Sequence, residues 1–335
     1  MKVAYLKKKN LIQLRDQPKP TAGKNQIVIR VQACGICGTD LHAALTNDDF
    51  MPFGHEIAGQ IVEIGQGVET LKVGQNVVLD SATPCGHCDM CRNMEQELCS
   101  NIQSFYFTNS FGMAEYVAVP AICAIAYSGL EPAEVILSEP LGVALDVARV
   151  ADIQPGNNVL IMGPGPIGLM IIRLVKMAGA EKIFVSALSD TIKRNQLAKE
   201  FGADSVIEVD KQPIEQCDFG CRIDRVISTT PPSTLTSAVK MAAKGGIITF
   251  IGLAGNSKKD ICFDADEFHF KKLQLRASFA SPALFGPKAI DILKKDTIIK
   301  ERLISHIFKF EEIDKAMDAA LNDVANSVKV VVRQL

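Results

Sequence analysis

The pattern of apolar and polar residues changes character at about residue 145. Before that point, residues 26–33 (QIVIRVQA) alternate between apolar and polar, which predicts a half-buried strand. Residues 57–79 carry short Val and Ile runs that are interrupted by four glycines. This pattern is typical of a small β-rich domain with tight turns.

After residue 145, strand-like and helix-like segments alternate. Residues 159–162 (VLIM) form a short apolar run, and residues 167–179 have apolar positions at helical spacing. The same alternation predicts strands at 182–187, 205–209, 225–229, 245–252 and 328–332, and helices at 191–203 and 237–244. Alternating β and α segments predict an α/β fold with a parallel sheet covered by helices on both faces.

A glycine-rich loop, GPGPIG, connects the first of these strands to the first helix. Gly163 allows the tight turn, Gly165 lets the backbone approach a pyrophosphate, and Gly168 lets helix and strand pack closely. Pro166 and Ile167 complete the loop and begin the helix, whose N-terminus offers free N–H groups to phosphates. The loop predicts dinucleotide binding, and an ordinary glycine turn is the alternative.

The choice between NAD and NADP depends on the end of the second strand. An acidic residue there would bind the ribose 2′-hydroxyl, but this chain has Ala187. Without the acid, a 2′-phosphate is not repelled, and basic residues of the next turn could bind it. This favours NADP(H); the alternative is that Asp190 reaches the ribose. The candidate contacts near this position are Ser186, Ser189, Lys193 and Arg194.

Composition and charge limit the class of protein. The length of 335 residues indicates two domains. The net charge of -2 gives no electrostatic basis for binding nucleic acid or an anionic membrane. No apolar run reaches the roughly 20 residues of a membrane span, and the N-terminus becomes polar too early for a signal peptide. We therefore expect a soluble, cytoplasmic protein, in which clustered cysteines usually bind metal.

Residues 84–99 contain four cysteines with the spacing C-x2-C-x2-C-x7-C. Four thiolates match the tetrahedral preference of zinc and leave no open position, so the pattern predicts a structural zinc site. Unrelated loop thiols are the alternative. A nucleic-acid zinc finger is disfavoured, because three carboxylates in this lobe face a single arginine. The predicted ligands are Cys85, Cys88, Cys91 and Cys99.

A second group of candidate ligands lies upstream, in CGICGTDLH (34–42) and GHE (54–56). Cys37, His55 and Glu56 offer a thiolate, an imidazole and a carboxylate to a second zinc with an open position. Such a zinc polarises an alcohol and lowers its pKa, which prepares hydride transfer to a nicotinamide. Taken singly, each residue could instead be an ordinary core residue, and Cys34 has the same local pattern as Cys37.

These motifs together resemble the zinc-dependent medium-chain alcohol dehydrogenase family, in its polyol (sorbitol-like) and threonine dehydrogenase branch. The resemblance covers essentially the full length. It is carried by the cysteine lobe, the GPGPIG loop and five further motifs, CGICGTDLH, GHEIAG, FGMAEYV, SEPLGVALDVAR and LAKEFGAD.

The resemblance implies a fold of two domains. Residues 1–145 and 275–335 would form a GroES-like catalytic domain that carries the structural zinc lobe (81–104). Residues 146–274 would form an inserted Rossmann domain, with the active site in the cleft between the two. Bacterial members are often homo-oligomers, so a tetramer or dimer is expected.

The resemblance also implies site roles. The catalytic zinc would be held by Cys37, His55, Glu56 and Glu139, the last directly or through water. Thr39 would bind the reacting oxygen, His42 would end a proton relay, and Asp40 would orient a zinc ligand. These roles imply hydride transfer between a secondary alcohol, such as a sugar alcohol, and NAD(P). The alternatives are a threonine-type or sugar-phosphate dehydrogenase and a non-catalytic nicotinamide-binding protein.

Three features depart from the family pattern and bear on specificity. The segment between Cys37 and His55 is short, Ala187 replaces the usual acid, and TTPP (229–232) replaces a Thr-Gly turn. The substrate is therefore left open. Core packing is the alternative for each of the candidate cleft-lining aromatic residues, which are Phe50, Phe105, Tyr106 and Phe107.

Overall fold

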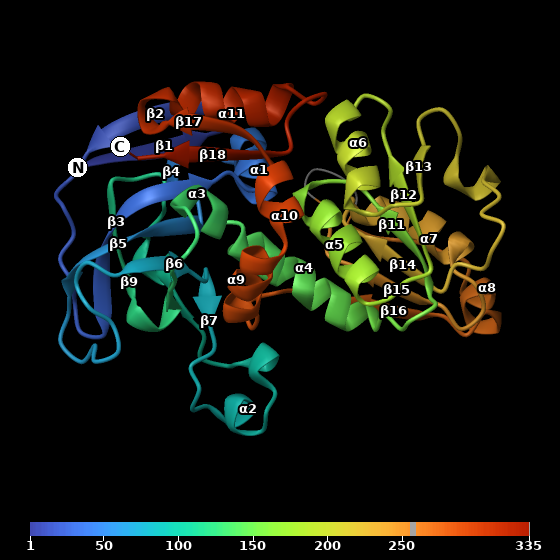
Figure 1. Ribbon diagram of the computed structural model, residues 1–335, viewed down its shortest axis with the longest axis horizontal. Coiled ribbons are helices and arrows are strands. Elements are labelled where there is room, and N and C mark those ends of the chain that lie inside the picture. Colours follow the sequence, from blue (N-terminus) through green and yellow to red (C-terminus); the bar gives the residue numbers. More distant parts are fainter. Residues whose placement is uncertain (255–258, 335) are drawn as a thin grey trace. The chain divides into compact units, whose positions relative to one another are not determined.

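The computed structural model describes residues 1–254 and 259–334, which divide into two compact units (Figure 1). The first unit comprises residues 1–142, 280–323 and the C-terminal segment from residue 327. The second comprises residues 143–279 and 324–326. The chain thus builds most of the first unit, passes through the second and returns to complete the first.

The first unit is built on mostly antiparallel sheets. The largest has the order β10-β6-β5-β3-β18-β17, and β9 also pairs with β3. Its strands are β3 (Gln26–Gly35), β5 (Glu56–Ile64), β6 (Asn76–Leu79), β9 (Tyr116–Pro120), β10 (Ala124–Ala126), β17 (Ile304–Lys309) and β18 (Lys329–Arg333). A three-stranded sheet joins β2 (Leu11–Asp16), β1 (Lys2–Lys7) and β4 (Met51–Pro52), and β7 (Ala82–Thr83) pairs with β8 (Gln103–Ser104).

Strand β3 is more deeply buried than its alternating sequence predicts. Ile27 and Ile29 enter the core as expected, but Val28 on the opposite face is also fully buried. The reason is that β3 has three partners, β5, β9 and β18, which together enclose it. Arg30 is the one exposed residue of the strand.

Short helices cover the sheets of the first unit. Helix α11 packs against β17 and β18 and places Ile313, Ala316 and Met317 in the core (Figure 1). The helices are α1 (Gly38–Thr46), α2 (Asp89–Arg92), α3 (Pro132–Val135), α9 (Gly286–Lys295), α10 (Thr297–Arg302) and α11 (Ile313–Asn322). The 3-10 turns are η1 (Gln96–Leu98), η2 (Phe105–Thr108), η3 (Ala121–Cys123) and η6 (Phe310–Glu312).

The second unit contains a six-stranded parallel sheet with the order β13-β12-β11-β14-β15-β16. This is the doubly wound order. From β11 the chain adds β12 and then β13 on one side, and afterwards adds β14, β15 and β16 on the other side. The strands are β11 (Asn158–Met162), β12 (Lys182–Ala187), β13 (Ser205–Glu208), β14 (Arg225–Ser228), β15 (Ile247–Phe250) and β16 (Gln274–Ala277). The predicted strands of this region are confirmed, whereas β16 gave no clear pattern in the sequence.

Helices pack on this sheet. Helix α5 contacts β11 and β12, and α7 contacts β14. The helices are α4 (Ser138–Ala151), which enters from the first unit, α5 (Pro166–Met177), α6 (Ile192–Phe201), α7 (Leu235–Met241) and α8 (Ala265–Phe270), with turns η4 (Ile214–Gln216) and η5 (Pro232–Thr234). Over the described chain, we find no helix with the length and apolar character needed to cross a bilayer.

The last residue of α6 provides a test of the second unit's packing. Phe201 is fully buried, so Phe201→Ala should leave a cavity and lower the free energy of unfolding by about 3–5 kcal/mol. Phe270, in α8, is 70% exposed, and Phe270→Ala should change it far less. Chemical denaturation of both variants checks this, and equal losses would contradict the packing.

Candidate metal centres and cofactor loop

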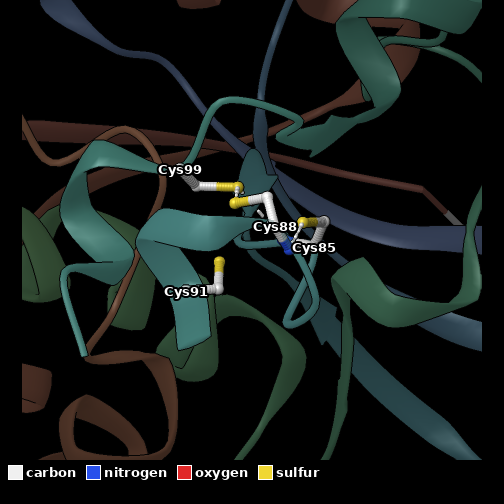
Figure 2. Close-up of side chains that lie close together, drawn as sticks. All are labelled: Cys85, Cys88, Cys91 and Cys99. Carbon is white, nitrogen blue, oxygen red and sulfur yellow. Dashed lines mark hydrogen bonds between the residues drawn. The ribbon is translucent and has the colours of Figure 1, made fainter. Parts of the chain in front are cut away.

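The four-cysteine lobe projects from the β7–β8 ladder and consists of turns, α2 and η1 (Figure 1). Its four Sγ atoms all lie within 4.8 Å of one another. Figure 2 shows the four side chains turned towards a common centre, with Cys91 contributed by α2. The structure therefore brings Cys85, Cys88, Cys91 and Cys99 together.

Backbone N–H groups in the lobe favour thiolates over thiols. The N–H of Cys85 donates to Cys99 Sγ at 3.3 Å, and the N–H of Cys88 donates to Cys85 Sγ at 3.4 Å. A hydrogen bond from the Cys91 backbone helps to lower the pKa of Cys88 to about 5, whereas burial raises the pKa of Cys91 to about 12. Four sulfurs with amide donors fit zinc, and the set leaves no position for substrate.

The second cluster is assembled by the pairing of β3 with β5. Gly35 lies opposite Glu56 in this register, so Cys37, the N-cap of α1 just after β3, is brought beside His55. The ligand atoms of Cys37, His55 and Glu56 lie within 4.8 Å of one another. Cys34 instead lies opposite Ile57 in the core, and burial raises the pKa of its thiol. The geometry thus separates two cysteines that look alike in the sequence.

Glu139 lies near this cluster but outside the group of three. It sits in the first turn of α4, and its Oε1 accepts a hydrogen bond from the Ser81 hydroxyl at 3.2 Å. Burial raises the pKa of Glu139, while the charge of His55 lowers it. Glu139 is therefore close enough to interact electrostatically with the cluster.

Negative charge surrounds the imidazole of His55. Burial alone would lower the pKa of His55, but Cys37, Glu139 and Asp40 raise it well above its ordinary value. Asp40 also accepts hydrogen bonds from the N–H groups of Cys37 at 2.9 Å and Gly54 at 3.2 Å. A divalent cation placed here would be stabilised by the same anionic groups.

A buried ion pair supports Glu56 from behind. Lys329 is 2% exposed, and its ammonium donates to Glu56 Oε1 and, at 3.1 Å, to the carbonyl of Ile36. Burial alone would lower the pKa of Lys329, but Glu56 and Cys37 raise it, so Lys329 is held as the ammonium. The other oxygen, Glu56 Oε2, is buried without a hydrogen-bond partner, which fits a carboxylate that has a metal as its second partner.

Sequence reasoning missed Lys329. The available signal was a single lysine in the otherwise apolar segment VKVVV (328–332). A strand with one solvent-facing side would alternate polar and apolar residues, and this segment does not. The remaining predicted residues of α1, Thr39 and His42, are exposed on that helix.

The candidate aromatic residues have different environments. The ring of Tyr106 lies 6.1 Å from that of His55, whereas Phe105 beneath it is fully buried. Phe107 is exposed, and Phe50 packs beside Lys7 and Arg15. Of these aromatic side chains, Tyr106 is the one in contact distance of the cluster.

The glycine loop has the shape that a pyrophosphate requires. Gly163 adopts a φ of +97°, and a Cβ on Gly168 would lie 2.0 Å from the carbonyl oxygen of Gly163. A Cβ on Gly165 would meet nothing within 4 Å, so open space faces this residue, which is the N-cap of α5. Pro166 and Ile167 start the helix, and the free N–H groups of its first turn can receive phosphate.

An acidic residue that the sequence analysis missed lies beside the end of β12. Asp210 accepts hydrogen bonds from the N–H of Ser189 at 2.8 Å and from its hydroxyl at 2.6 Å. Ser186 and Ala187 are buried in the strand. Lys193 and Arg194 lie in the first turn of α6, where burial lowers the pKa of Arg194. The region therefore offers both acidic and basic groups to a ribose or its phosphate.

Comparison with known proteins identifies the family. Residues 23–128 match the alcohol dehydrogenase GroES-like domain, and residues 166–295 match the zinc-binding dehydrogenase domain. A sorbitol dehydrogenase of Bacillus subtilis is 28% identical over 99% of this chain and 97% of its own length. An L-threonine 3-dehydrogenase of Pyrococcus horikoshii is 36% identical over 71% of each chain.

Solved structures agree with this result. An Escherichia coli alcohol dehydrogenase complexed with NADH has a TM-score of 0.89 and 28% identity, over 99% of both chains. A zinc-binding dehydrogenase from Sinorhizobium meliloti bound to NADP has a TM-score of 0.86 and 28% identity, over 99% of this chain and 98% of that one. The predicted fold class, a GroES-like domain plus a doubly wound Rossmann domain, is confirmed. The chain belongs to the zinc-binding, medium-chain alcohol dehydrogenase family.

Proposed function

We propose that this enzyme transfers hydride between a secondary alcohol, most simply a sugar alcohol, and NAD(P). The observation that carries the proposal is the grouping of Cys37, His55 and Glu56 within 4.8 Å, in a chain that also has a phosphate-binding glycine loop. A metal and a dinucleotide serve one reaction, which makes the pair more informative than either alone. We assign the metal chemistry to the first unit and nucleotide binding to the second.

The donor set fits a zinc ion with an open coordination position. Cys37, His55 and Glu56 would hold it, and Glu139 would complete the set directly or through water. When bound, the zinc would polarise the alcohol and lower its pKa. Asp40 fixes the backbone at Cys37, and Lys329 neutralises part of the negative charge on Glu56.

The remaining predicted residues take supporting roles. Thr39 would accept or donate a hydrogen bond at the reacting oxygen, and His42, exposed on the same helix, would pass a proton to water. In the second unit, Gly165 and the first turn of α5 would hold the pyrophosphate.

The substrate class rests on the carboxylate at position 139 and on the relatives. Among them are a sorbitol dehydrogenase, an L-galactonate-5-dehydrogenase and L-threonine 3-dehydrogenases. The 36% identity to a threonine dehydrogenase favours an amino alcohol as the second candidate. We further propose a cytoplasmic homo-oligomer, a tetramer or dimer; all ten cysteines are free, which suits a reducing compartment.

The reaction can be tested directly with a substrate panel. Zinc-loaded protein should form reduced cofactor from at least one polyol or from threonine, with NAD+ or NADP+. Cys37→Ser, which removes one ligand, should lower turnover more than about 100-fold while the fold persists. Full activity in that variant, or in zinc-stripped protein, would refute the proposal. Tight cofactor binding with no turnover and one zinc per chain would favour a binding protein.

The lobe should depend on its metal for stability. Leu98 and Met94 are exposed there, so metal ligation supplies the free energy that a core would otherwise provide. Cys91→Ser should remove about one zinc per chain and lower the melting temperature by about 10 °C. Cys221→Ser, at an exposed cysteine outside both clusters, is the matched control. An unchanged melting temperature for Cys91→Ser would contradict a structural zinc.

The buried ion pair can be tested by a double-mutant cycle. Lys329→Met should destabilise the protein by about 3–5 kcal/mol, because it leaves the Glu56 carboxylate buried without its cation. Adding Glu56→Gln should recover part of that loss. Urea denaturation of the two single variants and the double variant measures the coupling. Strictly additive losses would show that the two side chains do not stabilise each other.

A further inference from the structure

The hydroxyl of Ser104 joins two backbone groups at the base of the cysteine lobe. Ser104 is the last residue of β8 and is 3% exposed. Its hydroxyl donates to the carbonyl of Ser81 at 2.7 Å and accepts from the N–H of Tyr106 at 3.1 Å. The β7–β8 ladder ends at the pair Ala82 and Ser104, so these two groups lie beyond the ladder and need another partner.

Ser81 and Tyr106, the two residues that Ser104 hydrogen-bonds, each contact a residue of the candidate metal centre. The Ser81 hydroxyl donates to Glu139 Oε1 at 3.2 Å. The ring of Tyr106 lies 6.1 Å from the imidazole of His55.

Packing restricts the position of Tyr106 further. Its ring lies 5.1 Å from that of the fully buried Phe105 and 5.6 Å from that of Phe111. Ser81 and Tyr106 therefore form a fixed arm with Ser104 at its base; Ser81 reaches Glu139 by a hydrogen bond, and the Tyr106 ring lies beside His55.

We propose that Ser104 is a positioning residue for the catalytic centre. It fixes the position of Glu139 through Ser81 and the position of His55 through Tyr106. Ser104 touches neither substrate nor metal ligands in this role. Because β7 and β8 are also the two connections of the cysteine lobe, Ser104 links the order of that lobe to the geometry of the centre. The inference rests on the proposed function, since it assumes that His55 and Glu139 belong to one metal centre.

Loss of the hydroxyl should displace the arm without removing any ligand. In Ser104→Ala the carbonyl of Ser81 and the N–H of Tyr106 both lose their buried partner, so the two segments can move apart. A displacement of about 1 Å at a catalytic group can lower the rate by up to about 100-fold. We therefore expect kcat to fall by about 10–100-fold, with a smaller change in KM.

The experiment combines kinetics with a metal probe. Co2+ is exchanged into the catalytic position while zinc stays in the cysteine lobe, and the visible absorption of Co2+ reports the ligand geometry. Ser104→Ala and Ser81→Ala should both shift this spectrum and lower kcat, and Ser104→Thr, which keeps the hydroxyl, should restore both. The control is Ser278→Ala, which removes a buried hydroxyl that donates to Asp146 in the second unit.

The outcomes separate the inference from the proposed function. A Ser104→Ala protein with two metals, an unchanged Co2+ spectrum and unchanged kcat would overturn the role of Ser104 alone. Wild-type protein that binds no Co2+ outside the lobe would refute the metal centre and the inference with it. If Ser104→Ala does not fold, Tyr106→Leu, which removes the ring beside His55, must shift the spectrum, and an unchanged spectrum in both Tyr106→Leu and Ser81→Ala would overturn the inference.

Discussion

The burial of the Glu56 carboxylate is the constraint on which the first unit depends. Glu56 is fully buried at the start of β5, and such a charge is costly unless it is paired and hydrogen-bonded. Its cation, Lys329, comes from the opposite end of the chain. The strand that carries Lys329, β18, lies beside β3, which lies beside β5. The C-terminal strand thus returns to the first unit and places the cation beside Glu56.

The backbone beside Glu56 is adapted to this burial. A Cβ on Gly35 would lie 1.9 Å from Glu56 Oε2, so any larger residue would displace the carboxylate. The same stretch of β3 leads directly into Cys37 and α1. One strand thus supplies the space for the carboxylate and the thiolate next to it, which explains why ligands 18 and 19 positions apart in sequence can converge. The second unit uses glycine in a different way, since Gly165 leaves room for a ligand and Gly163 permits the turn.

Local signals in the sequence predicted the elements and motifs whose causes are local. The spacing of four cysteines, the strand-loop-helix context of GPGPIG and the runs that became β11 and β12 each depend on a few neighbouring residues. Long-range pairing decided the rest. Register between β3 and β5 turns Cys34 into the core and Cys37 towards His55, and no local pattern distinguishes the two. Lys329 and Asp210 were missed because their partners, Glu56 and Ser189, lie 273 and 21 residues away.

The two metal centres differ because their surroundings differ in charge and closure. In the cysteine lobe, four thiolates with amide donors would more than neutralise a divalent cation and would fill its coordination sphere. Around Glu56, one thiolate, one imidazole and carboxylates meet, and Lys329 removes part of their negative charge. In the proposed centre, a cation would keep more of its own charge and an open position, with which it would polarise an alcohol. The buried lysine would then contribute to the reactivity of that centre as well as to the stability of the fold.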